Sequence, residues 1–383
     1  MKIVIISNAL TPHQLPLCDA LAERIDEFKF IEAENIDKTA LPLGWRETRK
    51  RDYVVPYDYL MTHRAEVEKL ILSADAVIMG GDRTEFVKNR LDKGLLTFEY
   101  SERIYRRFKD YLKIPYHYFK FRKRYKCYSN LHLLCASAFT YSDFRKIGCF
   151  ANRAYKWGYF INVPDLDIEP TRLQKLQKHK IRILWVARLL ELKHPEAAIN
   201  VAKRLRMQSV DFEMAIYGEG PLYDRILTSI RSEALNDYVT INKPVPNTEL
   251  MQVMKDYDIF LFTSDKKEGW GVVANEAMAN ACALIGSSAI GSVPYLVKNN
   301  YNGKVYRDGN MAQLEACVFD LINDPEKRID ISINAYKTMH DVWSPQNAAA
   351  NFIKLVNDLN SKRECAIVQG PGSKAEQLQD DWF

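Results

Sequence analysis

The stretch Glu268-Gly-Trp-Gly-Val-Val-Ala-Asn-Glu276-Ala-Met-Ala279 decides how this sequence is interpreted. It follows the apolar run Ile259-Phe-Leu-Phe-Thr263, which predicts a buried strand, and it enters a helical pattern from Val272 to Ala281. Such a strand, glycine turn and helix start present backbone N–H groups to one spot, which suits a phosphate. The two flanking carboxylates accept hydrogen bonds and therefore suit hydroxyl groups. A site for phosphate and polyol together points to a nucleotide sugar.

In this context the run resembles the Glu-x7-Glu motif of retaining GT-B glycosyltransferases, most closely glycosyltransferase family 4. The resemblance implies that Glu276 holds the ribose hydroxyls and that Glu268 holds hydroxyls of the transferred sugar. It also implies donor contacts from the residues between them, which are Gly269, Trp270, Gly271, Val272 and Val273. The alternative is that both glutamates are solvated residues of a loop and a helix surface.

A pair of cations follows the predicted strand Ile181-Arg-Ile-Leu-Trp-Val-Ala187. Arg188 and Lys193 suit a departing diphosphate, because fixed cations stabilise the charge that develops as the glycosidic bond breaks. By themselves they would rather indicate two solvated surface cations. Their spacing resembles the Arg-x4-Lys phosphate clamp of family 4, in which a glycine usually follows the lysine; here that position is His194.

Further matches extend the resemblance along the C-terminal half. Tyr217-Gly-Glu-Gly-Pro-Leu222 resembles the glycine-rich turn of the family, which implies a donor contact at Gly218, and Asn302-Gly303 resembles a pair near the end of the nucleotide domain. The sequence departs from the family at four positions. These departures leave the nucleotide base of the donor undetermined, although a UDP-sugar is expected. These positions are Lys243, Ala281, Ala283 and Tyr295.

The order of strand-like and helix-like segments predicts an α/β protein with the GT-B fold, two Rossmann-like doubly wound domains facing a central cleft. The expected division is an acceptor-binding domain at 1–163, a polar linker at 164–180 and a nucleotide-sugar domain at 181–345. A C-terminal helix is expected at 346–362, with a return to the N-terminal domain as one option. The tail 363–383 contains Gly370-Pro-Gly-Ser373, which resembles an artificial linker, and we expect it to lie outside the fold.

Two residues of the N-terminal half are candidates for contact with substrates. Glu99 stands where the family often carries a histidine facing the reacting sugar, so the resemblance implies contact with the acceptor or the anomeric carbon. It is equally compatible with an exposed loop residue. His13 is a candidate for donor or acceptor contact, or a surface histidine at a helix start.

The tract Tyr100 to Lys126 combines ten Lys or Arg residues with nine aromatic residues and two acidic ones. A basic, aromatic, amphipathic helix suits an anionic membrane surface. Nucleic-acid binding is a weaker option, and a helix packed on its own domain is a third. The candidate membrane contacts are Arg106, Arg107, Arg122, Lys123 and Arg124.

Composition narrows the class of protein. No run of about 18 apolar residues suggests a membrane span, and the seven cysteines show no Cys-x-x-Cys pair. Asp165-Leu-Asp167 has the spacing of a metal motif but lies in the polar linker, so we expect no catalytic metal and no cofactor. The expected location is cytoplasmic, with peripheral attachment to the inner face of the cell membrane as an option.

The sequence therefore predicts a retaining, metal-independent glycosyltransferase. Its expected partners are a nucleoside-diphosphate sugar as donor and a glycan or lipid-linked acceptor, in cell-surface polysaccharide or glycolipid synthesis. The alternatives are a non-catalytic nucleotide-sugar-binding protein of the same fold and, less favoured, a DNA glycosyltransferase.

Overall fold

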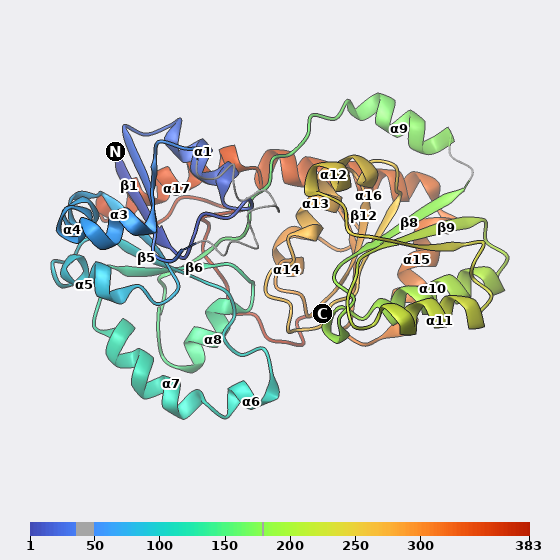
Figure 1. The fold of residues 1–383 in the computed structure, drawn as a ribbon, viewed down its shortest axis with the longest axis horizontal. Coiled ribbons are helices and arrows are strands. Elements are labelled where there is room, and N and C mark those ends of the chain that lie inside the picture. The colour runs from blue at the N-terminus through green and yellow to red at the C-terminus, as the bar shows by residue number, and fades with distance from the viewer. Residues whose placement is uncertain (36–49, 178–179) are drawn as a thin grey trace. The chain divides into compact units, whose positions relative to one another are not determined.

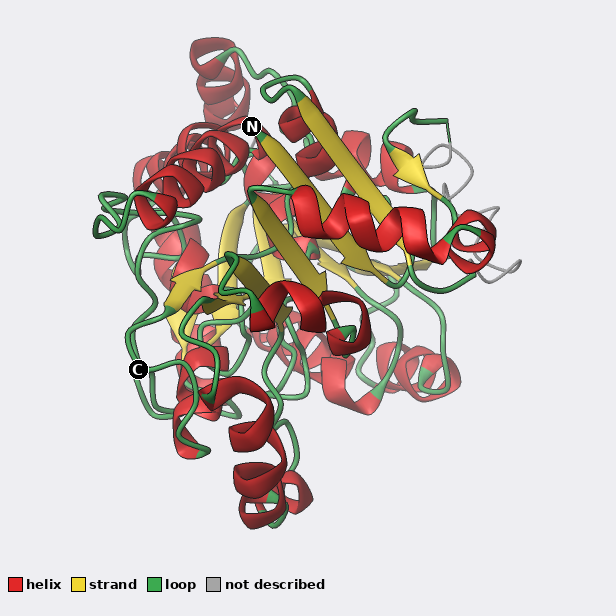
Figure 2. Ribbon diagram, turned by 90° about the vertical axis from the view of Figure 1, so that its left-hand side faces the viewer, coloured by secondary structure: helices red, strands yellow, loops and turns green. Residues whose placement is uncertain are grey.

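A computed structural model describes residues 1–35, 50–177 and 180–383. The chain divides into two compact units. Unit 1 contains Met1–Asn162 and Val342–Gln379, and unit 2 contains Val163–Asp341 and Asp380–Phe383. Each unit is a parallel sheet between layers of helices (Figures 1 and 2), so the predicted α/β class with two Rossmann-like domains is confirmed.

The sheet of unit 1 has the order β3-β2-β1-β4-β5-β6-β7 among the described residues, with parallel pairing throughout. The order reverses between β1 and β4, which makes this edge the switch point where such sheets bind ligands. The strands are β1 (Lys2–Ser7), β2 (Glu27–Glu32), β3 (Val54–Val55), β4 (Ala76–Gly80), β5 (Thr97–Ser101), β6 (Leu131–Cys135) and β7 (Ala154–Lys156).

Helices cover this sheet because their apolar stripes bury against the Val- and Ile-rich strands. α17 comes from the C-terminal part of the chain and lies beside α1. The described helices of unit 1 are α1 (Leu15–Ala22), α3 (Tyr57–Thr62), α4 (Arg64–Ser73), α5 (Thr84–Asp92), α6 (Phe108–Tyr111), α7 (Ile114–Phe121), the π-helix η2 (Arg122–Lys126), α8 (Thr140–Lys146) and α17 (Pro345–Asn360).

The sheet of unit 2 has the order β10-β9-β8-β11-β12-β13 among the described residues, again parallel. Its switch point lies between β8 and β11. The strands are β8 (Ile181–Val186), β9 (Phe212–Tyr217), β10 (Val239–Asn242), β11 (Ile259–Phe262), β12 (Ala283–Ser287) and β13 (Lys304–Tyr306).

The core of unit 2 fills the spaces between this sheet and its helices with Ile, Leu, Val and Ala side chains. The described helices are α9 (Ile168–Gln177), the 3₁₀ turn η3 (Glu191–Lys193), α10 (Pro195–Met207), α11 (Tyr223–Ser232), α12 (Asn247–Met254), α13 (Val273–Ala279), α14 (Val293–Leu296), α15 (Met311–Asn323) and α16 (Pro325–Lys337), followed by the π-helix η4 (Thr338–Val342).

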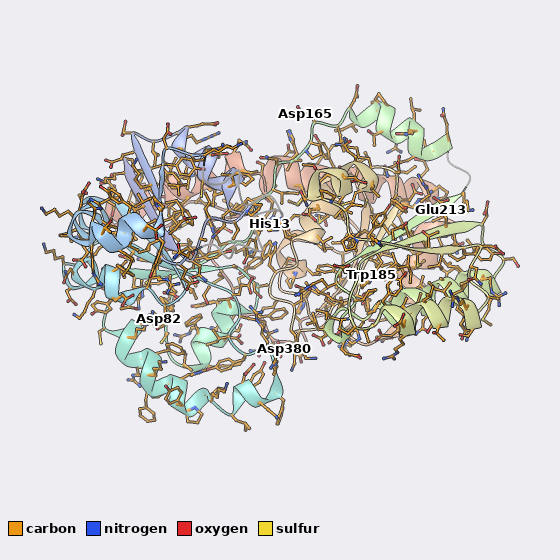
Figure 3. The ribbon with its side chains drawn as sticks, in the orientation of Figure 1. His13, Asp82, Asp165, Trp185, Glu213 and Asp380 are labelled. Atoms are coloured by element: carbon orange, nitrogen blue, oxygen red, sulfur yellow. The ribbon has the colours of Figure 1, made fainter. Side chains whose placement is uncertain are left out.

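The segment expected as a polar linker contains a packed helix. α9 lies against α16, and Arg172 forms ion pairs with Glu326 and Asp330 of that helix. Lys175 is buried, and its ammonium group donates to the Tyr257 carbonyl at 2.9 Å. Composition suggested a linker because the partners of these polar residues lie more than 80 residues away in sequence. Asp165 precedes α9 and is exposed, as expected (Figure 3).

The expectation that the tail lies outside the fold is wrong. Gly370 and Gly372 have φ angles of 73° and 84°, a conformation that favours glycine, and they turn the chain back onto β7. The Lys156 amide donates to the Ser373 carbonyl at 2.8 Å, and the Ala375 amide donates to the Ala154 carbonyl at 3.0 Å. The tail thus adds an antiparallel segment to the edge strand of unit 1, which covers hydrogen-bonding groups that would otherwise be exposed.

In the described part of the chain, no helix has the length and apolar character needed to span a membrane. The structure describes all seven cysteines, and none of them forms a disulfide; four are buried: Cys18, Cys135, Cys149 and Cys282.

Candidate functional site

The predicted donor residues of unit 2 gather at the switch point of its sheet. The loop after β8 carries Arg188 and Lys193, and the loop after β11 carries Glu268. Because β8 and β11 are neighbours with parallel direction, these loops leave the same edge of the sheet side by side.

An ion pair connects the predicted Arg188/Lys193 pair with the predicted Glu268/Glu276 pair. The Lys193 ammonium forms an ion pair with the Glu268 carboxylate, and these side chains are only 16% and 13% exposed. Arg188 is exposed and makes no ion pair within the described residues. The sequence placed Lys193 and Glu268 in one site, but it gave no sign that they neutralise each other in the free protein.

Hydrogen bonds through Thr263 hold the two loops in register. The indole N–H of Trp185 donates to the Thr263 hydroxyl at 2.8 Å, and that hydroxyl donates to the Lys193 carbonyl at 2.6 Å. The Asp265 amide also donates to the Leu192 carbonyl at 2.9 Å. Trp185 belongs to the buried face of β8 (Figure 3), so the core fixes the position of the lysine.

His194 is a further ionic link between these loops that the sequence did not assign. Its ring nitrogens lie 2.9 Å from a Glu196 carboxylate oxygen and 3.5 Å from an Asp265 oxygen. The hydrogen bonds that the ring donates to Asp265, which has the larger effect, and to Glu196 raise the pKa of His194 to about 10. The ring is therefore a charged imidazolium at neutral pH. Its φ of 49° explains why the family usually has glycine here, since the turn requires the left-handed region.

The glycines of the predicted site are required by close packing. Gly271 has a φ of 78°, and a Cβ there would lie 2.2 Å from the Phe262 ring. A Cβ at Gly218 would lie 2.0 Å from the Ala187 carbonyl oxygen, at the end of the neighbouring strand. Ala281, at another position where the family commonly has glycine, has a φ of 53° and follows the end of α13.

Glu276 is buried in the first turn of α13 and is 4% exposed. Burial raises its pKa to about 7, although a hydrogen bond from the Asn247 amide at 2.5 Å acts in the opposite direction. A carboxylate so placed has oxygens ready for hydroxyl donors and little water to compete with them. The sequence missed Asn247, because it starts a different helix 29 residues earlier.

Other residues of the predicted site stabilise the fold. Trp270 is 1% exposed and its indole N–H donates to the Asn275 side chain at 2.8 Å, so a donor contact there would have to come from its backbone. Val272 and Val273 are half-buried beside it, and Gly269 is buried. Asn302 closes a turn, since its side chain accepts from the Lys298 amide and donates to the Leu296 carbonyl.

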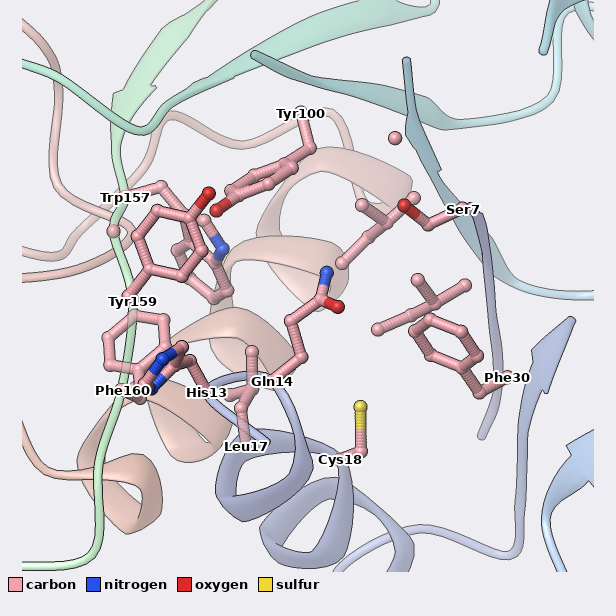
Figure 4. A pocket seen from close by; sticks show the side chains of 14 residues that line it. Ser7, His13, Gln14, Leu17, Cys18, Phe30, Tyr100, Trp157, Tyr159 and Phe160 are labelled. Atoms are coloured by element: carbon pink, nitrogen blue, oxygen red, sulfur yellow. The ribbon is translucent and has the colours of Figure 1, made fainter. Parts of the chain in front are cut away.

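Unit 1 has a cavity at its own switch point. Figure 4 shows aromatic rings of Tyr100, Trp157, Tyr159 and Phe160 on one side and Phe30 on the other. Ser7 ends β1 and Gly80 ends β4, which places the cavity at the carboxyl edge of the sheet. His13 and Gln14 enter it from the start of α1.

The two N-terminal candidates have different surroundings. His13 lines the cavity, and burial lowers the pKa of its imidazole, so the ring is neutral at pH 7. Glu99 lies inside β5, is 4% exposed, and does not line the cavity; the next residue, Tyr100, does. Burial raises the pKa of Glu99 to about 8, and the nearby Arg124 opposes this shift.

The basic tract is used in part by unit 1 itself. Arg106 forms an ion pair with Glu102, and Arg124 forms one with Asp82. The Arg122 guanidinium lies 5.0 Å from the centre of the Tyr118 ring. Arg107 is exposed, and the side chain of Lys123 lies outside the described part of the structure. Most of the cations predicted to contact a membrane therefore have partners within the protein.

The part of the chain that carries this site is similar to a known protein family. Residues 169–338 match the family Glycosyl transferases group 1. This part of the chain is therefore similar to group 1 glycosyl transferase domains. It contains all the polar donor-site candidates of unit 2 and does not extend over unit 1.

Two curated relatives are similar to this protein over less than half of the chain. The amylovoran biosynthesis glycosyltransferase AmsK of Erwinia amylovora is 32% identical over 170 residues, which are 42% of this chain and 42% of that protein. The phosphatidylinositol N-acetylglucosaminyltransferase GPI3 subunit of Saccharomyces cerevisiae is 26% identical over 158 residues, 41% of this chain and 33% of that protein. The chain thus spans less than half of the length of these relatives.

The fold agrees along nearly the whole chain with a solved structure. The Anabaena protein Alr3699/HepE, crystallised in complex with UDP, superposes with a TM-score of 0.68 over 94% of this chain and 100% of that one, at 16% identity. The predicted GT-B fold is confirmed.

Proposed function

We propose that this protein transfers a sugar from a nucleoside-diphosphate sugar to a hydroxyl group of a glycan or lipid-linked acceptor, with retention of anomeric configuration and without a metal ion. UDP-sugar is the proposed donor. The observation that carries the proposal is the pairing of Lys193 with Glu268 across the switch point of unit 2. It places a cation for diphosphate next to a carboxylate for sugar hydroxyls, where α/β sheets bind nucleotides.

In the proposed reaction the diphosphate leaves toward Arg188 and Lys193, whose charges stabilise the negative charge that develops on it. Glu276 accepts hydrogen bonds from the ribose hydroxyls and Glu268 accepts from the sugar. The acceptor hydroxyl attacks from the face that the diphosphate leaves, and its proton passes to a leaving-group oxygen. This scheme requires no protein nucleophile.

For unit 1 we propose acceptor binding in the cavity at the β1–β4 edge. Aromatic rings that present both an apolar face and a hydroxyl group suit a sugar or the first part of a lipid-linked chain. His13 and Gln14 supply polar contacts there. A role for Glu99 in contacting the acceptor remains a prediction, and it requires the side chain to leave its buried position in β5.

The setting we propose is cell-surface polysaccharide or glycolipid synthesis at the inner face of the cell membrane. The names of the relatives support the kind of synthesis and not the location: one is named for amylovoran biosynthesis and the other as a phosphatidylinositol N-acetylglucosaminyltransferase.

Donor hydrolysis measured with and without candidate acceptors tests the proposal, after a thermal-shift screen of nucleotide sugars has selected the donor. Release of nucleoside diphosphate, with loss of release in Lys193→Ala, supports an enzyme. Tight nucleotide-sugar binding without turnover for any acceptor supports a binding protein. NMR of the product reports whether the anomeric configuration is retained.

A further inference from the structure

The helical segment from α6 to α7 is apolar on two sides. One side packs on the core of unit 1 and accounts for the fold of this segment. It consists of Tyr111, Ile114, Tyr118 and Phe121, which are partly buried against that core. A helix that only covered its own domain would have a polar outer side.

The other side faces away from the core. Phe108, Leu112, Tyr116 and Phe119 are 77%, 71%, 62% and 74% exposed, and we call these four residues the outer ridge. Phe108 begins α6, Leu112 lies in the turn between the two helices, and Tyr116 and Phe119 lie three residues apart on one side of α7. Figure 1 shows α6 and α7 at the border of unit 1, and neither helix contains a fully buried residue. Large apolar side chains that are exposed together in one short segment indicate an interaction site.

The charges beside the outer ridge have one sign. In the described segment 107–120 the exposed charged residues are all basic: Arg107, Lys109, Lys113 and Lys120. The one acidic residue, Asp110, is partly buried and accepts from the backbone amides of Arg106 and Arg107. The Lys120 ammonium lies 5.7 Å from the Tyr116 ring, which is the arrangement of a long side chain that covers apolar surface and keeps its charge in water.

We propose that the outer ridge docks unit 1 on the interface of an anionic bilayer, with its aromatic and leucine side chains among the acyl chains and its lysines against the headgroups. Protruding apolar side chains edged by cations fit such an interface. A second copy of the chain would bring like charges together on this face. A single-stranded nucleic acid requires a cation-lined groove, whereas these cations edge an apolar ridge.

This inference deepens the proposed function, since it places the protein where a lipid-linked acceptor would be found. It also changes which residues act. Arg106 and Arg124, two of the five cations predicted from sequence, are paired inside unit 1, whereas Arg107, another of the five, is exposed beside the outer ridge. The docking residues are instead the four of the outer ridge and the exposed lysines beside them.

The test is co-sedimentation of the full chain with phosphatidylcholine vesicles, with and without phosphatidylglycerol. We expect binding to the anionic vesicles that high salt weakens and does not abolish, because insertion of apolar groups is insensitive to screening. Phe108→Ser/Phe119→Ser should lower the partition coefficient on the order of tenfold or more. Lys109→Ser/Lys113→Ser/Lys120→Ser should remove the salt-sensitive part.

Met61→Ser and Met207→Ser are matched controls, because both residues are exposed apolar side chains away from the outer ridge. They should bind vesicles as the wild type does. UDP affinity, measured for every variant, separates this inference from the proposed function, because the donor site is in unit 2.

Four results would overturn the inference. The first is a wild-type chain that ignores anionic vesicles while it binds UDP. The second is concentration-dependent dimerisation that Phe108→Ser/Phe119→Ser abolishes, without vesicle binding. The third is salt-sensitive binding to oligonucleotides in place of vesicles. Equal loss of vesicle binding in the Met61→Ser control would overturn it as well.

Discussion

Because Lys193 and Glu268 form an ion pair, we expect substitutions of the two residues to have coupled effects on UDP affinity. If Lys193 holds the diphosphate, Lys193→Ala removes a cation and also leaves the Glu268 carboxylate without its partner beside the bound phosphates. Glu268→Gln does the reverse and frees the ammonium group for the phosphate. The two substitutions should therefore have strongly coupled effects on UDP affinity.

The magnitude follows from the burial of the pair. Truncating one partner of a buried charge contact at a binding interface costs about 2–5 kcal/mol of affinity. Because Lys193 and Glu268 are 16% and 13% exposed, we take the lower end, roughly 2 kcal/mol, which is a loss of UDP affinity of about 30-fold in Lys193→Ala. Glu268→Gln alone should leave UDP affinity unchanged or raise it slightly. In Lys193→Ala/Glu268→Gln we expect recovery on the order of tenfold relative to Lys193→Ala, a coupling near 1.4 kcal/mol.

Isothermal titration calorimetry measures the UDP affinity of the wild type, the two single variants and the double variant, which together form a double-mutant cycle. Steady-state kinetics measures the turnover of the same four proteins. Turnover should fall on the order of 100-fold or more in Lys193→Ala, and the second substitution should not rescue it, because the lost charge acts on the leaving group.

Arg188 provides the matched control, since it is exposed and makes no ion pair in the described structure. Arg188→Ala and Glu268→Gln should be additive in UDP affinity. Additive effects in the Lys193 cycle as well, or unchanged turnover in a folded Lys193→Ala protein, would refute the reasoning.

Three further predictions concern Glu276, His194 and the tail. The pKa of Glu276 is raised from 4.5 to about 7 in the folded protein, so its stability contribution is lost as pH rises through 7. Glu276→Gln should raise the free energy of unfolding at pH 8 by up to about 3 kcal/mol, and this gain should vanish near pH 4.5. Calorimetry should show weaker UDP binding in the same variant. The pKa of His194 is raised from 6.5 to about 10, so the stability difference between wild type and His194→Gln should be largest below pH 6.5 and fade through pH 10 in a melting series. Deletion of residues 363–383 should lower the melting temperature on the order of 5–10 °C by exposing the edge at β7, and an unchanged melt would contradict the packing described above.

The sequence predicted elements whose signal is local. The strands predicted at Ile181–Ala187 and Ile259–Thr263 are β8 and β11, each one residue shorter than its apolar run indicated. The Glu-x7-Glu run was interpretable because its strand, glycines and helix are adjacent in the chain. Gly271 illustrates this, since the motif placed a glycine where the backbone has a φ of 78°.

What the sequence did not reveal depends on partners that are distant in the chain. α9 was taken for a linker because the acidic residues that pair with Arg172 are more than 150 residues away. Asn247 gave no signal of its link to Glu276 for the same reason. The outer ridge was hidden because composition shows that a tract is basic and aromatic, but only the fold decides which of its aromatic residues face the core and which face solvent.

The free donor site also explains why its residues have such different environments. Glu276 is buried where ionisation is disfavoured, and His194 has a backbone conformation that favours glycine. Both are costs to the stability of the free protein, and such costs are retained where function requires them. The Lys193–Glu268 pair acts in the opposite direction, since each charge satisfies the other until a ligand supplies phosphate to one and hydroxyl groups to the other. A nucleoside diphosphate alone offers no sugar hydroxyls to Glu268, so it leaves that carboxylate unsatisfied, whereas the intact nucleotide sugar satisfies both. In the proposed reaction the pair therefore gives the site a physical reason to prefer the donor over the diphosphate product, which would favour release of the product after transfer.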